Sequence, residues 1–163
     1  RIGNGEDEVI FGHKDNHVFF KIGRTIVTST LIAAKFPDYR KVIPEDNQKL
    51  LKMESSQLAD VVRRVSLLSS DRSRAVKLSV SKGSLEISSN NPEVGEASET
   101  IDLDYDGESM AIGSNARYLS DFLQAIGSGP VILALKDAGT QGLFRPVGVE
   151  GRDYRYVVMP MRL

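Results

Sequence analysis

The chain has 163 residues, of which 40% are hydrophobic and 26% are charged, and its formal net charge is −1. This composition is ordinary for a soluble globular protein, and the length suffices for one full core and part of a second domain. The near-zero charge excludes a bulk attraction to nucleic acid or acidic lipid. The absence of cysteine excludes disulfide bonds and thiolate metal sites, and no apolar run approaches the roughly 18 residues that span a bilayer. We therefore expect a cytoplasmic protein.

The first part of the chain predicts strands and no helix. These strands are Val9–Phe11, His17–Lys21 and Thr25–Thr28. They are β-branched or aromatic runs separated by turn signals, and three strands alone form a layer too thin to bury a core. Pro37 and Pro44 then punctuate an extended connector, so we place residues 1–42 in an incomplete domain and residues 43–163 in a complete one. Because the sequence begins with Arg1 and not with Met, we expect a fragment of a longer product.

Two helices are predicted in the second part of the chain. The first begins near Glu54 with Ser55 or Ser56 as its N-cap, because apolar residues then recur at helical spacing up to Leu68. The second begins after Asn115, a good N-cap, and ends at Gly127. Strands are predicted at Val76–Val80, Leu85–Ile87 and Thr100–Leu103 after the first helix, and at Val131–Leu135, Gly142–Arg145 and Tyr154–Met159 after the second.

The two halves of this second part resemble each other. The helical segment Leu58–Val65 aligns with Leu119–Ile126, and each is followed by three predicted strands. A duplication of about 60 residues predicts a domain with pseudo-twofold symmetry, in which two helices pack on strands from both copies.

The sequence offers little for catalysis or metal binding. The segment Asp102–Gly107 matches the first half of an EF-hand loop, but the twelfth position is Gly113, where a bidentate carboxylate is needed. His13 and His17, the only histidines, lie near a predicted turn without a recognisable nucleophile motif. We expect neither an enzyme nor a cofactor or metal site. A metal-dependent nuclease that uses the acids within 102–108 is the enzymatic alternative.

The run Tyr156–Leu163 stays apolar to the end of the printed sequence. Exposed apolar ends gain nothing from being ordered, so this run is expected either to be a last core strand or to line a groove that a partner fills. Two methionines that flank Pro160 favour the groove, because methionine adapts its shape to varied apolar partners.

Three segments together resemble the bacterial DNA polymerase III β sliding clamp family. They are the connector Phe36–Pro44, the segment Asn90–Glu93 and the closing run Tyr156–Leu163, and the resemblance covers the whole chain. It implies an α+β DNA-clamp fold, with duplicated units of one helix and three strands and with helices on one face of antiparallel sheets. Residues 1–42 would end the middle clamp domain, and residues 43–163 would form the third.

The resemblance also implies a function in DNA replication. Clamps of this family are non-catalytic processivity factors of DNA-directed DNA polymerase III, and they encircle duplex DNA as a head-to-tail homodimer without reading its sequence. A hydrophobic cleft binds peptides of the Gln-Leu-x-Leu-Phe type from the polymerase III α subunit, the clamp loader, other DNA polymerases and repair proteins. A generic peptide-binding module with no role on DNA is the alternative.

The family's functional positions map onto two groups of residues. The peptide-binding cleft would use Pro37, Lys41, Val42, Asn115, Tyr118, Val157, Met159, Pro160, Met161, Arg162 and Leu163. The subunit interface would use Arg64, Leu67, Leu68, Ser73, Glu93, Glu96 and Glu99.

The chain departs from the family pattern at several of these positions. Lys41 stands where the family often has arginine, which removes a planar donor fork. Ser73 replaces an aromatic residue that many clamps have at the dimer contact. Gly139 and Gln141 replace a branched apolar and a small polar residue of the cleft wall, and the loop 146–153 is longer.

Overall fold

The computed structural model describes residues 8–70, 72–148 and 153–162. The chain divides into two compact units, Arg1–Asp38 and Tyr39–Leu163. The predicted domain boundary, between residues 42 and 43, falls inside the second unit, just after the short 3-10 helix η1 (Tyr39–Lys41).

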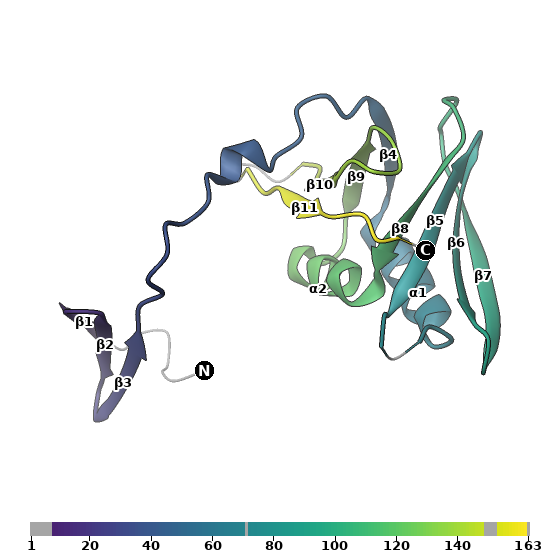
Figure 1. The fold of residues 1–163 in the computed structure, drawn as a ribbon. Coiled ribbons are helices and arrows are strands. Elements are labelled where there is room, and N and C mark those ends of the chain that lie inside the picture. Colours follow the sequence, from purple (N-terminus) through teal and green to yellow (C-terminus); the bar gives the residue numbers. More distant parts are fainter. Residues whose placement is uncertain (1–7, 71, 149–152, 163) are drawn as a thin grey trace. The chain divides into compact units, whose positions relative to one another are not determined.

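The first unit is a single antiparallel sheet. Its strands are β1 (Val9–Lys14), β2 (His17–Ile22) and β3 (Thr25–Thr30), in the order β1-β2-β3 (Figure 1). All three strands predicted from the sequence form. Val9, Ile10 and Phe11 are each more than half exposed, as expected of a layer too thin to bury a core.

Besides η1, the second unit contains two α-helices and eight strands among its described residues. They are β4 (Lys49–Glu54), α1 (Ser55–Ser66), β5 (Ala75–Ser81), β6 (Ser84–Asn91), β7 (Gly95–Asp102), β8 (Met110–Asn115), α2 (Ala116–Ile126), β9 (Pro130–Leu135), β10 (Gly142–Pro146) and β11 (Tyr156–Val158). Each repeat is therefore a strand, a helix and three strands. The repeat predicted from the sequence lacked the leading strands β4 and β8. β4 is rich in lysine and glutamate, and β8 contains Gly113. Neither composition favours a strand.

The leading strand of each repeat pairs with the other repeat. One four-stranded sheet has the order β11-β10-β9-β4, and the other has the order β7-β6-β5-β8. Leu51 of β4 lies opposite Leu133 of β9, and Ile112 of β8 lies opposite Leu78 of β5. The predicted duplication is thus confirmed, and the two copies are joined by hydrogen bonds as well as by side-chain packing.

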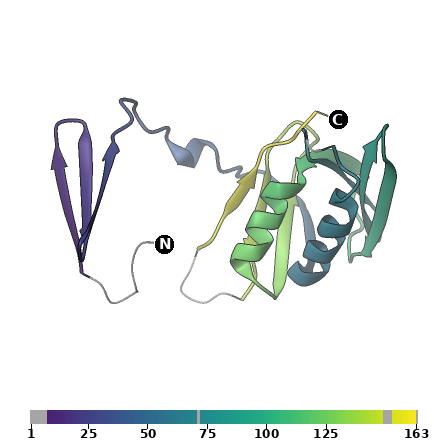
Figure 2. The same cartoon turned by 90° about the horizontal axis from the view of Figure 1, so that it is seen from below.

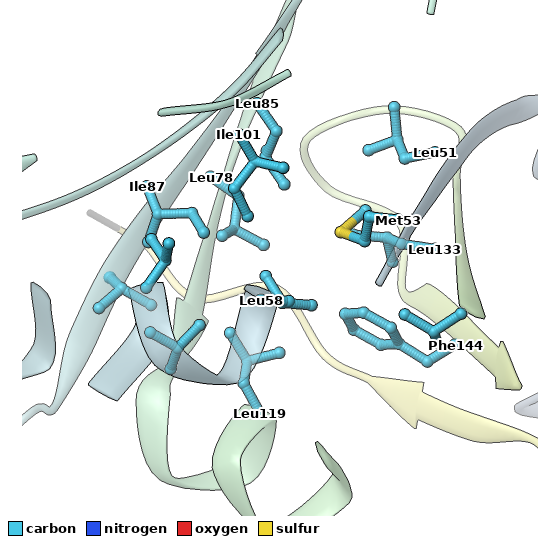
Figure 3. Close-up of a cluster of buried hydrophobic side chains, with 14 of the residues drawn as sticks. Leu51, Met53, Leu58, Leu78, Leu85, Ile87, Ile101, Leu119, Leu133 and Phe144 are labelled. Atoms are coloured by element: carbon cyan, nitrogen blue, oxygen red, sulfur yellow. The ribbon is translucent and has the colours of Figure 1, made fainter. Parts of the chain in front are cut away.

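The helices lie side by side between the two sheets (Figure 2). Figure 3 shows buried side chains of both sheets pointing towards Leu58 of α1 and Leu119 of α2. Each of these leucines is 1% exposed. Burying such a side chain contributes about 1.5–3 kcal/mol, so the apolar stripes that predicted the helices also hold the sheets together.

The two helices begin in different ways. Asn115 caps α2 as predicted, since its side chain accepts hydrogen bonds from the backbone amides of Arg117 and Tyr118. The predicted capping of α1 by Ser55 or Ser56 is wrong, because the N-cap is Glu54 and Ser55 lies in the first turn. The buried Ser55 hydroxyl instead donates to the Gly127 carbonyl at 2.7 Å, where α2 ends. Ser55 thus forms a hydrogen bond with the end of α2 instead of capping its own helix.

Gly142, at the start of β10, lies where no side chain fits easily. A Cβ there would lie 3.1 Å from Leu135 Cδ2 and 3.3 Å from Leu133 Cδ1. Both leucines are core residues on β9, at 1% and 2% exposure, so they have little room to move.

We expect Gly142→Ala to lower the free energy of unfolding by about 1–3 kcal/mol, because it overpacks the core. Urea denaturation would measure this. Gly139→Ala is the matched control, since its Cβ would meet only the Asp137 carboxylate, at 3.6 Å. Equal stability of the two variants would contradict the argument.

Candidate functional site

An apolar pocket of about 360 Å³ lies where α2 begins and β11 ends. It is lined by Asn115, Tyr118, Tyr156, Val157, Val158, Met159, Pro160 and Met161. Six of these residues belong to the predicted cleft set, namely Asn115, Tyr118, Val157, Met159, Pro160 and Met161. The structure thus brings together residues from two parts of the chain that the sequence separates.

The terminal segment, residues 159–162, builds one side of this pocket by crossing between the sheets. β11 is an edge strand, with Val157 opposite Leu143 of β10. Beyond it, the Met161 amide donates to the Gly113 carbonyl at 2.9 Å, on the outer edge of β8. Val158 is a core residue at 7% exposure, as expected of a last core strand, whereas Met159 is 64% exposed and lines the pocket.

The opposite side is fixed by the start of α2. The Asn115 oxygen accepts from the Arg117 amide at 2.9 Å and from the Tyr118 amide at 3.4 Å. Its amide nitrogen donates to the Ser73 carbonyl at 3.2 Å. Tyr118 remains 56% exposed. A cap residue and its first helical turn therefore present an amide and a phenol beside an apolar surface.

Tyr156 lines the pocket and was missed by the sequence-based prediction. Its ring stacks on Phe122, with centroids 4.9 Å apart and planes at 22°, and its hydroxyl donates to the Tyr118 carbonyl at 3.1 Å. Burial of the hydroxyl raises the pKa of Tyr156, and the nearby Asp121 carboxylate adds a smaller effect in the same direction. The hydroxyl therefore remains a hydrogen-bond donor at neutral pH. The sequence feature that could have identified it is its place as the aromatic first residue of the apolar run Tyr156–Leu163.

Hydrogen bonds from two side-chain amides, those of Gln141 and Asn47, join the connector to the strands β9 and β10. Gln141 Nε2 donates to the Val42 carbonyl at 3.1 Å, and Gln141 precedes Gly142, which lies opposite Val158 on β11. Asn47 Nδ2 donates to the Gln141 and Ala134 carbonyls, both at 2.9 Å. Gln141 therefore ties Val42 to the start of β10.

Three other predicted cleft residues, Lys41, Val42 and Arg162, are not among the residues that line this pocket. Lys41 and Val42 are exposed on the connector, and Pro37 belongs to the first unit. Arg162 lines a separate hollow, which Met161 also borders. Leu163 lies outside the described residues, as does part of the loop 146–153.

The predicted interface residues gather around the end of α1 and the edge strand β7. Arg64 forms two hydrogen bonds with Glu99, at 2.7 and 2.6 Å, so this charge pair is already compensated within one chain. Leu67 is 77% exposed and Leu68 is half-buried. Glu93 lies in the turn before β7, Glu96 is exposed on β7, and Ser73 is exposed before β5.

The acidic segment shows no arrangement for metal chemistry. Asp106 pairs with Lys82 at 2.5 Å, and Glu108 pairs with Lys49 at 3.3 Å. No group of three histidine, aspartate or glutamate side chains among the described residues could hold a metal ion. None of the described helices is long and apolar enough to cross a membrane.

The comparisons with known proteins agree with this architecture. Residues 40–162 match the family model described as the DNA polymerase III beta subunit, C-terminal domain. The chain is 37% identical over 160 residues to the Beta sliding clamp of Pseudomonas aeruginosa, and 38% identical over 146 residues to that of Caulobacter vibrioides. It spans 42% and 39% of these relatives, which is less than half of their length.

Solved structures give the same answer for the fold. The DNA polymerase sliding clamp from Pseudomonas aeruginosa matches with a TM-score of 0.81 at 37% identity, over 97% of this chain and 43% of that one. The pol III beta of Caulobacter crescentus matches with a TM-score of 0.82 at 37% identity, over 95% and 41%. The fold is that of a sliding-clamp domain. The chain belongs to the DNA polymerase III beta subunit family.

Tyr156→Phe should lower the free energy of unfolding by about 0.5–1.5 kcal/mol, because it removes the hydrogen bond to Tyr118 and keeps the stacking on Phe122. Urea denaturation would measure it. Tyr154→Phe is the control, since Tyr154 also stacks on Phe122, with centroids 6.1 Å apart, and is 42% exposed. An equal or larger loss of stability in Tyr154→Phe would show that the hydrogen bond of the Tyr156 hydroxyl does not stabilise the fold.

The Arg64–Glu99 pair should make stability depend on pH. The Arg64 guanidinium lowers the pKa of Glu99 below its ordinary value. The ionised carboxylate therefore stabilises the fold above the unfolded-state pKa of about 4.3, and this contribution is lost as the pH falls through the lower, folded-state pKa. We expect Glu99→Gln to be slightly less stable than the wild type at pH 7, and this difference to shrink at pH 2.

Urea midpoints at the two pH values test this expectation. Glu96→Gln, on the same strand, is the control, because Glu96 takes part in no ion pair among the described residues. A gap between Glu99→Gln and the wild type that is unchanged at pH 2 would contradict the assignment.

Proposed function

We propose that this chain is part of a sliding-clamp subunit that serves as a non-catalytic processivity factor in the cytoplasm. The parent protein would encircle duplex DNA as a head-to-tail dimer and tether replication proteins to it. The observation that carries this proposal is the exposed apolar pocket at the start of α2, within a chain of the DNA polymerase III beta subunit family.

The pocket has the chemistry of a peptide-binding site. Its walls are mainly apolar, with the Asn115 amide and the Tyr118 and Tyr156 phenols as polar groups. A few placed polar groups in an apolar recess orient a short peptide, while apolar side chains provide the affinity. Met159 is largely exposed, and its flexible thioether can pack against different apolar side chains.

The partners would carry peptides of the Gln-Leu-x-Leu-Phe type. They are the polymerase III α subunit, the clamp loader, other DNA polymerases and repair proteins, which would compete for one cleft. The connector residues Pro37, Lys41 and Val42 would extend this cleft, and so would Arg162 and Leu163. A site shared in this way requires modest affinity, so that one partner can replace another.

The subunit contact would use the free edge of β7. β7 is the outer strand of its sheet, and an unpaired strand edge is a ready site for pairing with another chain. Leu67 and Val94, beside this edge, are 77% and 62% exposed. The residues Arg64, Leu68, Ser73, Glu93, Glu96 and Glu99 would surround this contact in the homodimer.

DNA would be held by topology and by a weak, diffuse field. Arg63 and Arg117 on the helices each have an aspartate within one turn, Asp60 at 3.2 Å and Asp121 at 3.9 Å. Such paired charges give little net attraction to phosphate, and they offer no ordered set of base contacts. A ring that slides on DNA without reading its sequence requires this behaviour.

Met159→Ala should weaken binding of a fluorescent Gln-Leu-x-Leu-Phe peptide about tenfold. The substitution removes an apolar side chain from the contact, and burying such a side chain contributes about 1.5–3 kcal/mol to the binding free energy. Fluorescence anisotropy on this chain would measure the dissociation constant. Circular dichroism should be unchanged, since Met159 is exposed.

Leu50→Ala is the matched control for this experiment. Leu50 is also an exposed apolar residue, at 48%, but it lies on β4, at the opposite edge of the sheet from β11. An equal effect of both substitutions, or an unchanged dissociation constant in Met159→Ala, would contradict the assignment of the pocket.

A further inference from the structure

A second hollow, of about 590 Å³, lies on the outer face of the sheet formed by β5, β6 and β7. Its walls include Lys77, Glu86, Glu96, Met161 and Arg162, together with several serines. Side chains alternate along these strands, so Val76 and Leu78 enter the core while Lys77 faces outwards. The hollow is therefore more polar than the pocket at the start of α2.

The two recesses share a wall. Met161 lines the apolar pocket and also the polar hollow. It is held there by the bond from its amide to the Gly113 carbonyl, at 2.9 Å. A peptide seated in the pocket can therefore continue over the terminal segment onto the outer face of the sheet.

The charges of the hollow follow the order of the strands. Arg162 lies in the terminal segment beside β8, and Lys77 lies on the adjacent strand β5. Glu86 on β6 and Glu96 on β7 follow farther out. None of these four side chains belongs to an ion pair found in the described part of the chain, whose pairs involve other residues. The near side is thus positive and the far side negative.

We propose that this hollow binds an extended segment of the partner peptide next to its apolar motif, with an acidic residue first and a basic residue beyond it. The inference rests on the proposed function of the pocket and names a further determinant of partner choice. An acidic side chain would meet Lys77 and Arg162, and a basic one farther along would meet Glu86 on β6. The hollow and the charge order together fit a segment that crosses the strands.

The spacing of the strands sets the position of the acidic residue. Gly113 of β8 forms a β-bridge with Met161 on one side and lies opposite Lys77 of β5 on the other. Lys77 therefore lies two strand spacings from Met161, or about 10 Å. Three extended residues cover about 10 Å. The acidic residue should stand about three residues from the motif.

Five fluorescent peptides test this inference on the chain as it exists. One is the Gln-Leu-x-Leu-Phe motif alone, and the other four carry a two-residue Gly-Ser spacer followed by Glu or by Lys, at one end of the motif or at the other. For the end that faces the hollow, the Glu peptide should bind about two- to fivefold tighter than the motif alone, the range of exposed ion pairs. The gain should shrink in 1 M salt.

Substitutions of lysine identify the hollow as the source of the gain. In Lys77→Gln the Glu peptide should lose much of its advantage while the motif alone binds as before, and in Lys77→Glu the Lys peptide should become the tighter one. Lys52→Gln, on an exposed position of β4, is the control and should change nothing.

Each other outcome overturns the inference. If the motif binds and the Glu and Lys peptides bind equally, the hollow plays no part and the proposed function of the pocket stands. If the gain is undiminished in Lys77→Gln, another surface provides it. If none of the peptides binds, both the inference and the proposed function of the pocket are wrong for this chain.

Discussion

The pairing of β4 with β9 and of β8 with β5 is the constraint on which the rest of this structure depends. Each repeat gives its leading strand to the sheet of the other, so neither repeat can satisfy its own backbone hydrogen bonds alone. The exchange fixes both helices between the sheets, with Leu58 and Leu119 facing a common core. Two copies of a small unit become one cooperative domain in this way.

This exchange also places the pocket. β8 forms one edge of its sheet and β11 forms one edge of the other, and α2 starts directly after β8. The terminal segment closes the gap between these edges through the bond between Met161 and Gly113. The pocket is therefore supported by elements of both sheets and by a capped helix start, and such rigid support favours a defined binding geometry.

The sheet β7-β6-β5-β8 carries two proposed contacts at opposite edges. The pocket adjoins β8 and the subunit contact adjoins β7, which are three strand spacings apart, or about 14 Å. The polar hollow lies on the outer face between them. The hollow borders both proposed contacts, because Met161 also lines the pocket and because Ser73 and Glu96 also belong to the proposed subunit contact.

The sequence by itself determined the helices, most strands, the cap at Asn115 and the duplication, because these depend on periodicity and turn chemistry within short segments. It also singled out the terminal run. Only the tertiary structure decided the strand exchange, the bond of Ser55 to Gly127, the place of Tyr156 in the pocket and the pairing of Arg64 with Glu99. These contacts join residues far apart in the chain, and their formation depends on which faces are buried together, which no local pattern specifies.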